Sequence, residues 1–276
     1  MITKNNICLL FDFIRDQKKN SSFNLNYTNR SFIINKDAQS ADIIIKKNNI
    51  IFQCKINRSL EEIAQILIPI LLNKKNFFIG QIGQSLDGKI ALNNGNSHYI
   101  NDKLSITYLH CLRCICQAVV VGVNTVIKDN PILTTRMVKG TNPVRVIIDP
   151  FLKLNNNYKI FKDGFRNIIF THSHVSKKFN NTTVYKLPKK DFTIQIYKKL
   201  KLLNFHYVLI EGGATTLSKF IDNKLLDIMQ FIISPMIIGS GISSLKLKTI
   251  SNLDKALRPK NKIYRFGNEI IVSLDF

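Results

Sequence analysis

From Phe77 onward the sequence alternates between short apolar runs and longer amphipathic segments, and this alternation constrains the fold most strongly. The runs at 118–123 and 144–149 are continuous, as expected of strands that are buried on both faces of a sheet. The segments at 102–117 and 192–203 are typical of helices. Strands that are joined through helices pair in parallel, so the sequence predicts an α/β fold with helices on both faces of one sheet.

The remaining segments extend this pattern to the end of the chain. Further strands are expected at 77–82, 167–170, 207–210 and 228–234, with a helix at 215–223. The last strands, from residue 264 onward, follow with little helix between them. We therefore predict a three-layer sandwich with a mostly parallel central sheet and an antiparallel C-terminal edge.

The first 75 residues have a different pattern and are expected to form a small segment of unknown role before a domain at 77–276. A helix is expected at the start, followed by a polar tract at 18–29. A second helix is expected to begin at Ser59 and run to about residue 72, because Ser59 and Glu62 have the spacing of a capping box. Short strands are expected at 31–34, 42–45 and 50–52.

The chain is strongly basic, with 40 Lys and Arg against 18 Asp and Glu and a net charge of +22. Such a charge is typical of proteins with a polyanionic partner. However, the chain is also rich in Asn, Ile and Lys, which have AT-rich codons, and it lacks Trp. Its lysines are scattered, so drift in base composition is the preferred explanation, and a nucleic-acid-binding protein stays the alternative from another class.

The cysteines and the apolar stretches indicate the cellular compartment in which the protein is expected. Five cysteines, an odd number without regular spacing, predict reduced thiols in a cytosol. The longest apolar stretch, 63–72, contains Gln65 and Pro69 and is about half as long as a membrane-spanning helix. No secretory signal is apparent. We therefore expect a cytoplasmic protein with no membrane association.

In open α/β sheets, ligands bind beyond the carboxyl ends of the strands, so the residues that follow the strands are the candidates for a site. After the strand at 207–210, Gly212 and Gly213 lead into a helix, where backbone amides and the helix dipole suit a phosphate. A plain strand-to-helix turn explains the same glycines. The dinucleotide fingerprint and the P-loop motif are absent from the strand ends.

His110 and three cysteines nearby resemble zinc ligands, but they fall within one predicted helix. No second ligand pair completes a tetrahedral site, so no metal is expected.

Several motifs together resemble one known domain. The matching segments are 85–91, 95–100, 121–126, 129–131, 133–136, 143–149, 211–213 and 234–239. In order and spacing they resemble the reductase domain of riboflavin biosynthesis, which forms the C-terminal part of bacterial bifunctional deaminase-reductases. The resemblance covers about 77–276 and implies a dihydrofolate-reductase-like fold, NADPH as the cofactor and a homodimer.

The family's reaction is what the resemblance implies, namely hydride transfer from NADPH to the ribosyl group of a 5-amino-6-(5-phosphoribosylamino)uracil-type pyrimidine. Asp129 and Glu211 match the catalytic positions, with Asp129 expected to do proton work near the sugar. The positions that match substrate contacts are Ser97, Arg113, Leu133, Arg136 and Glu211. The positions that match cofactor contacts are Gln84, Tyr99, Thr125, Asp129, Gly212, Gly213, Ala214, Thr215 and Thr216.

Two features separate this chain from the familiar enzymes of that family. Gln81 stands where they carry Lys, which keeps hydrogen bonding but removes a charge. The deaminase half is missing, since the first 75 residues are too few and lack the zinc ligands, so no deaminase activity is expected. A reductase of a related pterin or pyrimidine therefore stays open. An inactive scaffold is disfavoured by the joint retention of Arg113, Asp129, Arg136 and Glu211.

Overall fold

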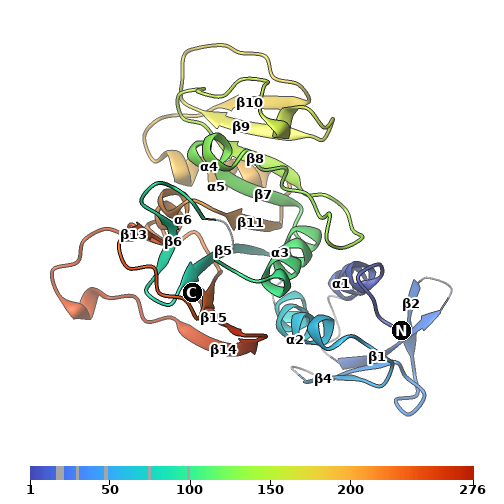
Figure 1. Ribbon diagram of the computed structural model, residues 1–276. Coiled ribbons are helices and arrows are strands. Elements are labelled where there is room, and N and C mark those ends of the chain that lie inside the picture. The colour runs from blue at the N-terminus through green and yellow to red at the C-terminus, as the bar shows by residue number, and fades with distance from the viewer. Residues whose placement is uncertain (17–21, 29–30, 47–48, 74–75, 98–99) are drawn as a thin grey trace. The chain divides into compact units, whose positions relative to one another are not determined.

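The computed structural model describes residues 1–16, 22–28, 31–46, 49–73, 76–97 and 100–276 (Figure 1). The chain forms two compact units. Unit 1 contains 1–76 together with 103–115 and 135–142. Unit 2 contains 77–102, 116–134 and 143–276. The first unit therefore takes a helix and a loop from the middle of the chain in addition to the N-terminal segment.

Unit 1 combines three helices with a small antiparallel sheet. The helices are α1 (Ile7–Asp16), α2 (Arg58–Asn73) and α3 (Lys103–Ile115), and they pack on one another. The sheet has the order β2-β1-β3-β4, with β1 (Ser22–Thr28), β2 (Ser31–Asn35), β3 (Ile43–Lys46) and β4 (Asn49–Phe52). The buried face of α1 presents Ile7, Leu10 and Phe11, spaced as one face of a helix requires.

Two details of unit 1 differ from the predictions. Strand β1 lies within the segment 18–29, for which the sequence predicts only a polar tract. It forms a strand because Phe23 and Leu25 alternate with polar residues and are buried. Helix α2 is confirmed, but the predicted cap is wrong. The side chain of Asn57 accepts the amide of Ser59 at 2.9 Å, while Glu62 pairs with Arg58 at 3.2 Å instead of closing a capping box.

Unit 2 is built on a nine-stranded sheet of order β10-β9-β8-β7-β11-β5-β12-β15-β14. All neighbours from β10 to β12 are parallel, and β15 and β14 are antiparallel. In chain order the strands are β5 (Phe77–Ser85), β7 (Ala118–Gly122), β8 (Val144–Ile148), β9 (Asn167–Thr171), β10 (Thr182–Lys186), β11 (Tyr207–Glu211), β12 (Ile228–Ser234), β14 (Lys260–Phe266) and β15 (Glu269–Asp275). The predicted α/β class, the mostly parallel sheet and its antiparallel C-terminal edge are confirmed.

Helices α5 (Phe192–Leu202) and α6 (Ala214–Asp222) cover one face of this sheet. Alternate strand residues such as Phe78, Val120 and Ile210 form the core with Leu200 of α5 and Leu217 of α6. The other elements of unit 2 are a short helix α4 (Val123–Asp129), two 3₁₀ turns (Lys159–Phe161 and Leu253–Lys255) and a two-stranded ladder of β6 (Lys89–Leu92) with β13 (Gly241–Ser243). Strands β6, β10 and β13 were not predicted, since they are short and only partly buried.

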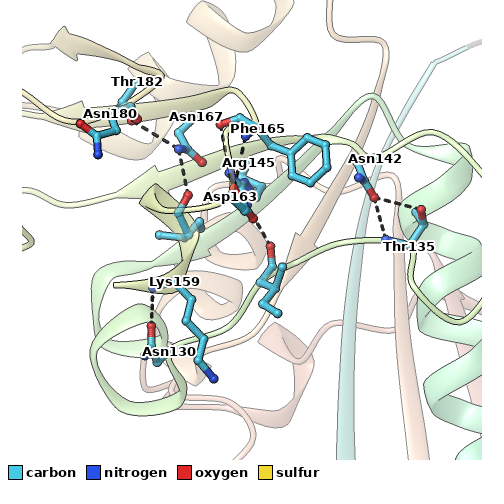
Figure 2. Close-up of polar contacts among 12 residues, drawn as sticks. Asn130, Thr135, Asn142, Arg145, Lys159, Asp163, Phe165, Asn167, Asn180 and Thr182 are labelled. Atoms are coloured by element: carbon cyan, nitrogen blue, oxygen red, sulfur yellow. Dashed lines mark hydrogen bonds and ion pairs between the residues drawn. The ribbon is translucent and has the colours of Figure 1, made fainter. Parts of the chain in front are cut away.

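A buried arginine ties the loops beside this sheet together (Figure 2). Arg145 of β8 is only 1% exposed, and its guanidinium holds both carboxylate oxygens of Asp163 at 2.5 and 2.8 Å. It also donates to the carbonyls of Ile132 at 3.2 Å and Phe165 at 3.0 Å. Burial would raise the pKa of Asp163, but hydrogen bonds from Arg145 and the amide of Phe165 outweigh it, and the pKa is lowered. This arginine therefore fixes the chain that follows α4.

Replacing Arg145 with Met should lower the free energy of unfolding by about 2–3 kcal/mol, because it removes the guanidinium that pairs with the partly exposed Asp163 and leaves two carbonyls without their donor. Urea unfolding followed by circular dichroism measures the change. The matched control is Arg166→Met, at an exposed position nearby, which should change stability by less than about 0.5 kcal/mol. Equal effects of the two substitutions would contradict the structural role of Arg145.

Candidate active site

The predicted site residues gather beyond the carboxyl ends of the parallel strands of unit 2. A cavity of about 270 Å³ lies there, between the loop after β6, helix α4 and the start of α6. Six of the predicted residues are on its wall, namely Ser97, Thr125, Asp129, Gly213, Ala214 and Thr215. They come from three separate segments of the sequence, so only the fold brings them together.

The start of α6 is shaped to receive an anion. Gly212 and Gly213 have φ angles of +87° and +62°, which favour glycine. A β-carbon on Gly213 would lie 3.2 Å from the hydroxyl oxygen of Thr125, so α4 and this turn approach closely. Gly213 is the N-cap of α6 and has no side chain with which to cap the helix. Ala214 and Thr215 of the first turn line the cavity, so their backbone amides are candidates for binding an anion, as in known phosphate sites.

The turn after β5 is held by Asp87. The hydroxyl of Ser85 donates to this carboxylate at 2.5 Å, and the amides of Ile238 and Gly239 donate at 3.1 and 2.6 Å. These bonds, with that from Ser85 the largest cause, lower the pKa of Asp87 to about 2. Asp87 thus joins the turn at 85–88 to the turn after β12.

Three polar residues form a row across the middle of the sheet. Gln81 of β5 lies opposite Glu211 of β11 on one side and Gln230 of β12 on the other. Gln81 is 5% exposed and Gln230 is fully buried. Residues at matched positions on adjacent strands point to the same face, so a carboxylate and two amides stand side by side. Gln81, the position at which the resemblance leads us to expect Lys, therefore has the carboxylate of Glu211 as its neighbour.

Three other predicted residues of unit 2 lie off the cavity wall. The side-chain oxygen of Gln84 is buried, and in the described part of the chain it has no hydrogen-bond partner. Thr216 is turned toward the sheet, because its hydroxyl would be only 2.5 Å from a β-carbon on Gly122. Leu133 has a φ of +58° and a buried side chain. Gln84 therefore keeps an unpaired acceptor oxygen inside the protein, whereas Thr216 serves packing.

The two predicted arginines belong to unit 1. Arg113 of α3 is 6% exposed, and Arg136 is exposed in the loop that follows Thr135. Both act on His110, whose pKa is lowered to about 3 by burial first and then by the charges of Arg113 and Arg136. Asn142 closes the loop by accepting the amide and the hydroxyl of Thr135 (Figure 2). The arginines therefore create one electropositive region around a neutral histidine.

Seven residues on the cavity wall were not predicted, and three of them have long or polar side chains that could contact a ligand, namely Asn124, Lys128 and Lys246. Lys128 could have been predicted, because it lies between the matched segments 121–126 and 129–131 and directly precedes Asp129. Lys246 lies in a loop without a strand-end signal. The predicted cofactor contact Tyr99 lies outside the described residues. Among the residues that are described, no group of three or more His, Cys, Asp or Glu could hold a metal, and no helix is long and apolar enough to cross a membrane.

Comparison with known proteins identifies similar domains. The family model described as the RibD C-terminal domain matches residues 76–272. Riboflavin biosynthesis protein RibD of Aquifex aeolicus is 36% identical over 68% of this chain and 54% of its own length. The 2,5-diamino-6-ribosylamino-4(3H)-pyrimidinone 5′-phosphate reductase of Methanothermobacter thermautotrophicus is 28% identical over 71% of this chain and 96% of its own. The chain thus spans about half the length of the first of these relatives.

Solved structures give the same result. The diaminohydroxyphosphoribosylaminopyrimidine deaminase/5-amino-6-(5-phosphoribosylamino)uracil reductase of Thermotoga maritima is 31% identical, with a TM-score of 0.62 over 78% of this chain and 62% of that one. The riboflavin biosynthesis reductase Rib7 of Saccharomyces cerevisiae has a TM-score of 0.57 over 72% of this chain and 89% of its own, at 19% identity. The second likeness shows the fold alone.

The lowered pKa of Asp87 predicts how stability depends on pH. A carboxyl whose pKa falls from 3.8 to about 2 on folding stabilises the protein above pH 4, and that stabilisation is lost as the pH falls toward 2. Asp87→Asn should therefore weaken stability at neutral pH and reduce its decline between pH 4 and pH 2. Urea unfolding at several pH values measures both. Asp191→Asn, at a position without a side-chain cap bond, should retain the wild-type pH profile.

Proposed function

The chain belongs to the RibD C-terminal domain family, and from this premise we propose that it is an NADPH-dependent reductase of riboflavin biosynthesis. Its proposed substrate is 5-amino-6-(5-phosphoribosylamino)uracil, whose ribosyl group becomes the ribityl group of the product. The observation that carries the proposal is the cavity at the strand ends, where six residues selected from the sequence meet. The cytoplasmic location and the homodimer belong to the same proposal.

The residues of the cavity fit a nicotinamide dinucleotide. The uncapped amides at the start of α6 would bind the pyrophosphate, and Thr125 beside Gly213 would add a hydroxyl. Gln84, off the cavity wall, is proposed as a further cofactor contact, because its buried side-chain oxygen lacks a partner in the described part of the chain. When bound, NADPH supplies the hydride.

The reaction needs a proton as well as a hydride. Reduction at the anomeric carbon breaks its bond to the ring oxygen, and that oxygen takes up a proton. Asp129 ends helix α4 on the cavity wall and is the carboxyl group proposed to hold this proton. Its loop is anchored by Asn130, whose side-chain oxygen accepts the amide of Lys159 at 2.8 Å (Figure 2).

The substrate's polar groups are assigned to the residues whose chemistry suits them. Arg113 and Arg136 are proposed for the phosphate, because guanidinium groups form bidentate, charge-assisted hydrogen bonds with it. Glu211, at the end of β11, is proposed to accept from pyrimidine N–H groups, and Ser97 and Leu133 complete the proposed contacts. The neutral Gln81 favours a second candidate, a reductase of a related pterin or pyrimidine.

The test is NADPH consumption by the purified chain with the phosphoribosylamino-pyrimidine before and after its deamination, and with a dihydropterin. We expect consumption with the deaminated pyrimidine, a product that has gained two hydrogens by mass spectrometry, and much weaker activity on the dephosphorylated form. Activity on the dihydropterin alone would support the second candidate. Lack of any consumption would overturn the reductase proposal.

Gly213→Val should abolish binding of NADPH while the protein stays folded. The new side chain would meet Thr125 and occupy the space proposed for the pyrophosphate. Fluorescence titration with NADPH and a thermal melt measure the two effects. Gly164→Val is the matched control, since Gly164 also has a positive φ of +79° but open space around it. Both variants should lose about 1–3 kcal/mol to backbone strain, and only Gly213→Val should lose NADPH.

Gln81→Lys should fold and retain substrate affinity, because the new ammonium would lie beside the carboxylate of Glu211 on the adjacent strand. The KM for the pyrimidine and the midpoint of urea unfolding are the readouts. The control Gln230→Lys places the same charge between Gln81 and Ser273, where no acid is in register. Burying an unpaired charge is costly, so that variant should be destabilised by several kcal/mol. A sharp loss of affinity in Gln81→Lys would indicate a pocket for another heterocycle.

A further inference from the structure

A larger cavity lies in unit 1, and none of its lining residues is assigned to the reductase reaction. Its volume is about 840 Å³, within the range of small-molecule sites. It is bounded by the first residues of the chain, by the segment 55–57 and by the first turns of α2 and α3. The bridge between Ile2 and Ile56 joins the first two of these. The cavity is therefore built from three distant parts of the sequence.

The floor of this cavity is aliphatic and its rim is basic. Ile2 and Leu60 are buried at the floor. Lys4, Lys55, Arg58 and Lys103 stand on the rim, and all four are exposed. These four are the Lys and Arg among the 13 lining residues, whereas the whole chain has 40 in 276. The lining is therefore richer in basic residues than the chain as a whole.

Acidic side chains neutralise only part of the positive charge on the rim of the cavity. Among the lining residues that the structure describes, none is Asp or Glu. Glu62 pairs with Arg58 at 3.2 Å, Glu61 lies in the first turn of α2, and Asp102 precedes Lys103. Asn57 already caps α2, so the start of this helix adds nothing to the argument. Like charges around one cavity repel, and a bound anion would relieve that repulsion.

We propose that this cavity binds a phosphorylated metabolite of mononucleotide size. The lysines and Arg58 would hold the phosphate, and the aliphatic floor would take the face of a sugar or a heterocycle. The described lining residues include no aromatic side chain, whereas single-stranded nucleic acid is typically bound by stacking on aromatic rings. A concave site without such rings favours a small ligand over a strand. This binding would give the N-terminal unit a role separate from the reductase reaction.

The experiment is a titration of the full chain with AMP, adenosine and inorganic phosphate, followed by amide NMR. The amides of Ile2 and Leu60 report this cavity, and the amide of Ala214 reports the proposed cofactor cavity on the same sample. We expect AMP and phosphate to shift Ile2 and Leu60, adenosine to have little effect, and added salt to weaken the response. The double variant Lys55→Glu/Lys103→Glu should raise the Kd for AMP at least tenfold at these two amides.

The control variant Lys36→Glu/Lys46→Glu makes the same change of charge in unit 1 at exposed positions off the cavity, and it should leave the Kd within twofold. Equal weakening in both variants would show a general charge effect and overturn the proposal. So would an AMP response confined to Ala214, or adenosine binding as tight as AMP. Binding of an RNA oligonucleotide without binding of AMP would instead make this face a nucleic-acid surface.

Discussion

The close approach of helix α6 to the sheet is the contact on which the candidate site depends. Two strands lack a side chain where α6 crosses them. A β-carbon on Gly80 would lie 2.9 Å from Leu217, and one on Gly122 would lie 2.5 Å from Thr216. The helix can therefore sit directly on β5 and β7. Its uncapped N-terminus then lies at the strand ends, next to Thr125 and Asp129.

Polar contacts also hold the loops that carry the other site residues. Arg145 fixes the chain after α4 through the carbonyl of Ile132, and Asp87 joins two turns at the edge of the sheet. Both contacts involve a charged group with several hydrogen bonds, which makes them strong and directional. The site is thus positioned by one packed helix and two charged anchors.

Some features escaped sequence reasoning for identifiable physical reasons. Strand β1 is amphipathic, and its polar residues hid the inward side chains of Phe23 and Leu25. Both Asn57 and Ser59 are residue types that cap helices, so the sequence alone does not decide between them. In the structure the side chain of Asn57 accepts the backbone amide of Ser59. Lys246 reaches the cavity from a loop without regular structure. In each case the local sequence pattern was weak or was compatible with more than one structure.

The sequence by itself determined the α/β class, the order of the main strands and helices, and the segments from which a site could be built. Those features follow from hydrophobic periodicity, glycines and local motifs, which act over a few residues. Only the tertiary structure decided that Ser97, Thr125, Asp129 and Gly213 share one cavity, that Gln81 stands between Glu211 and Gln230, and that Asp87 is an anchor. Strand register and loop contacts join residues more than a hundred positions apart, and no local pattern encodes them.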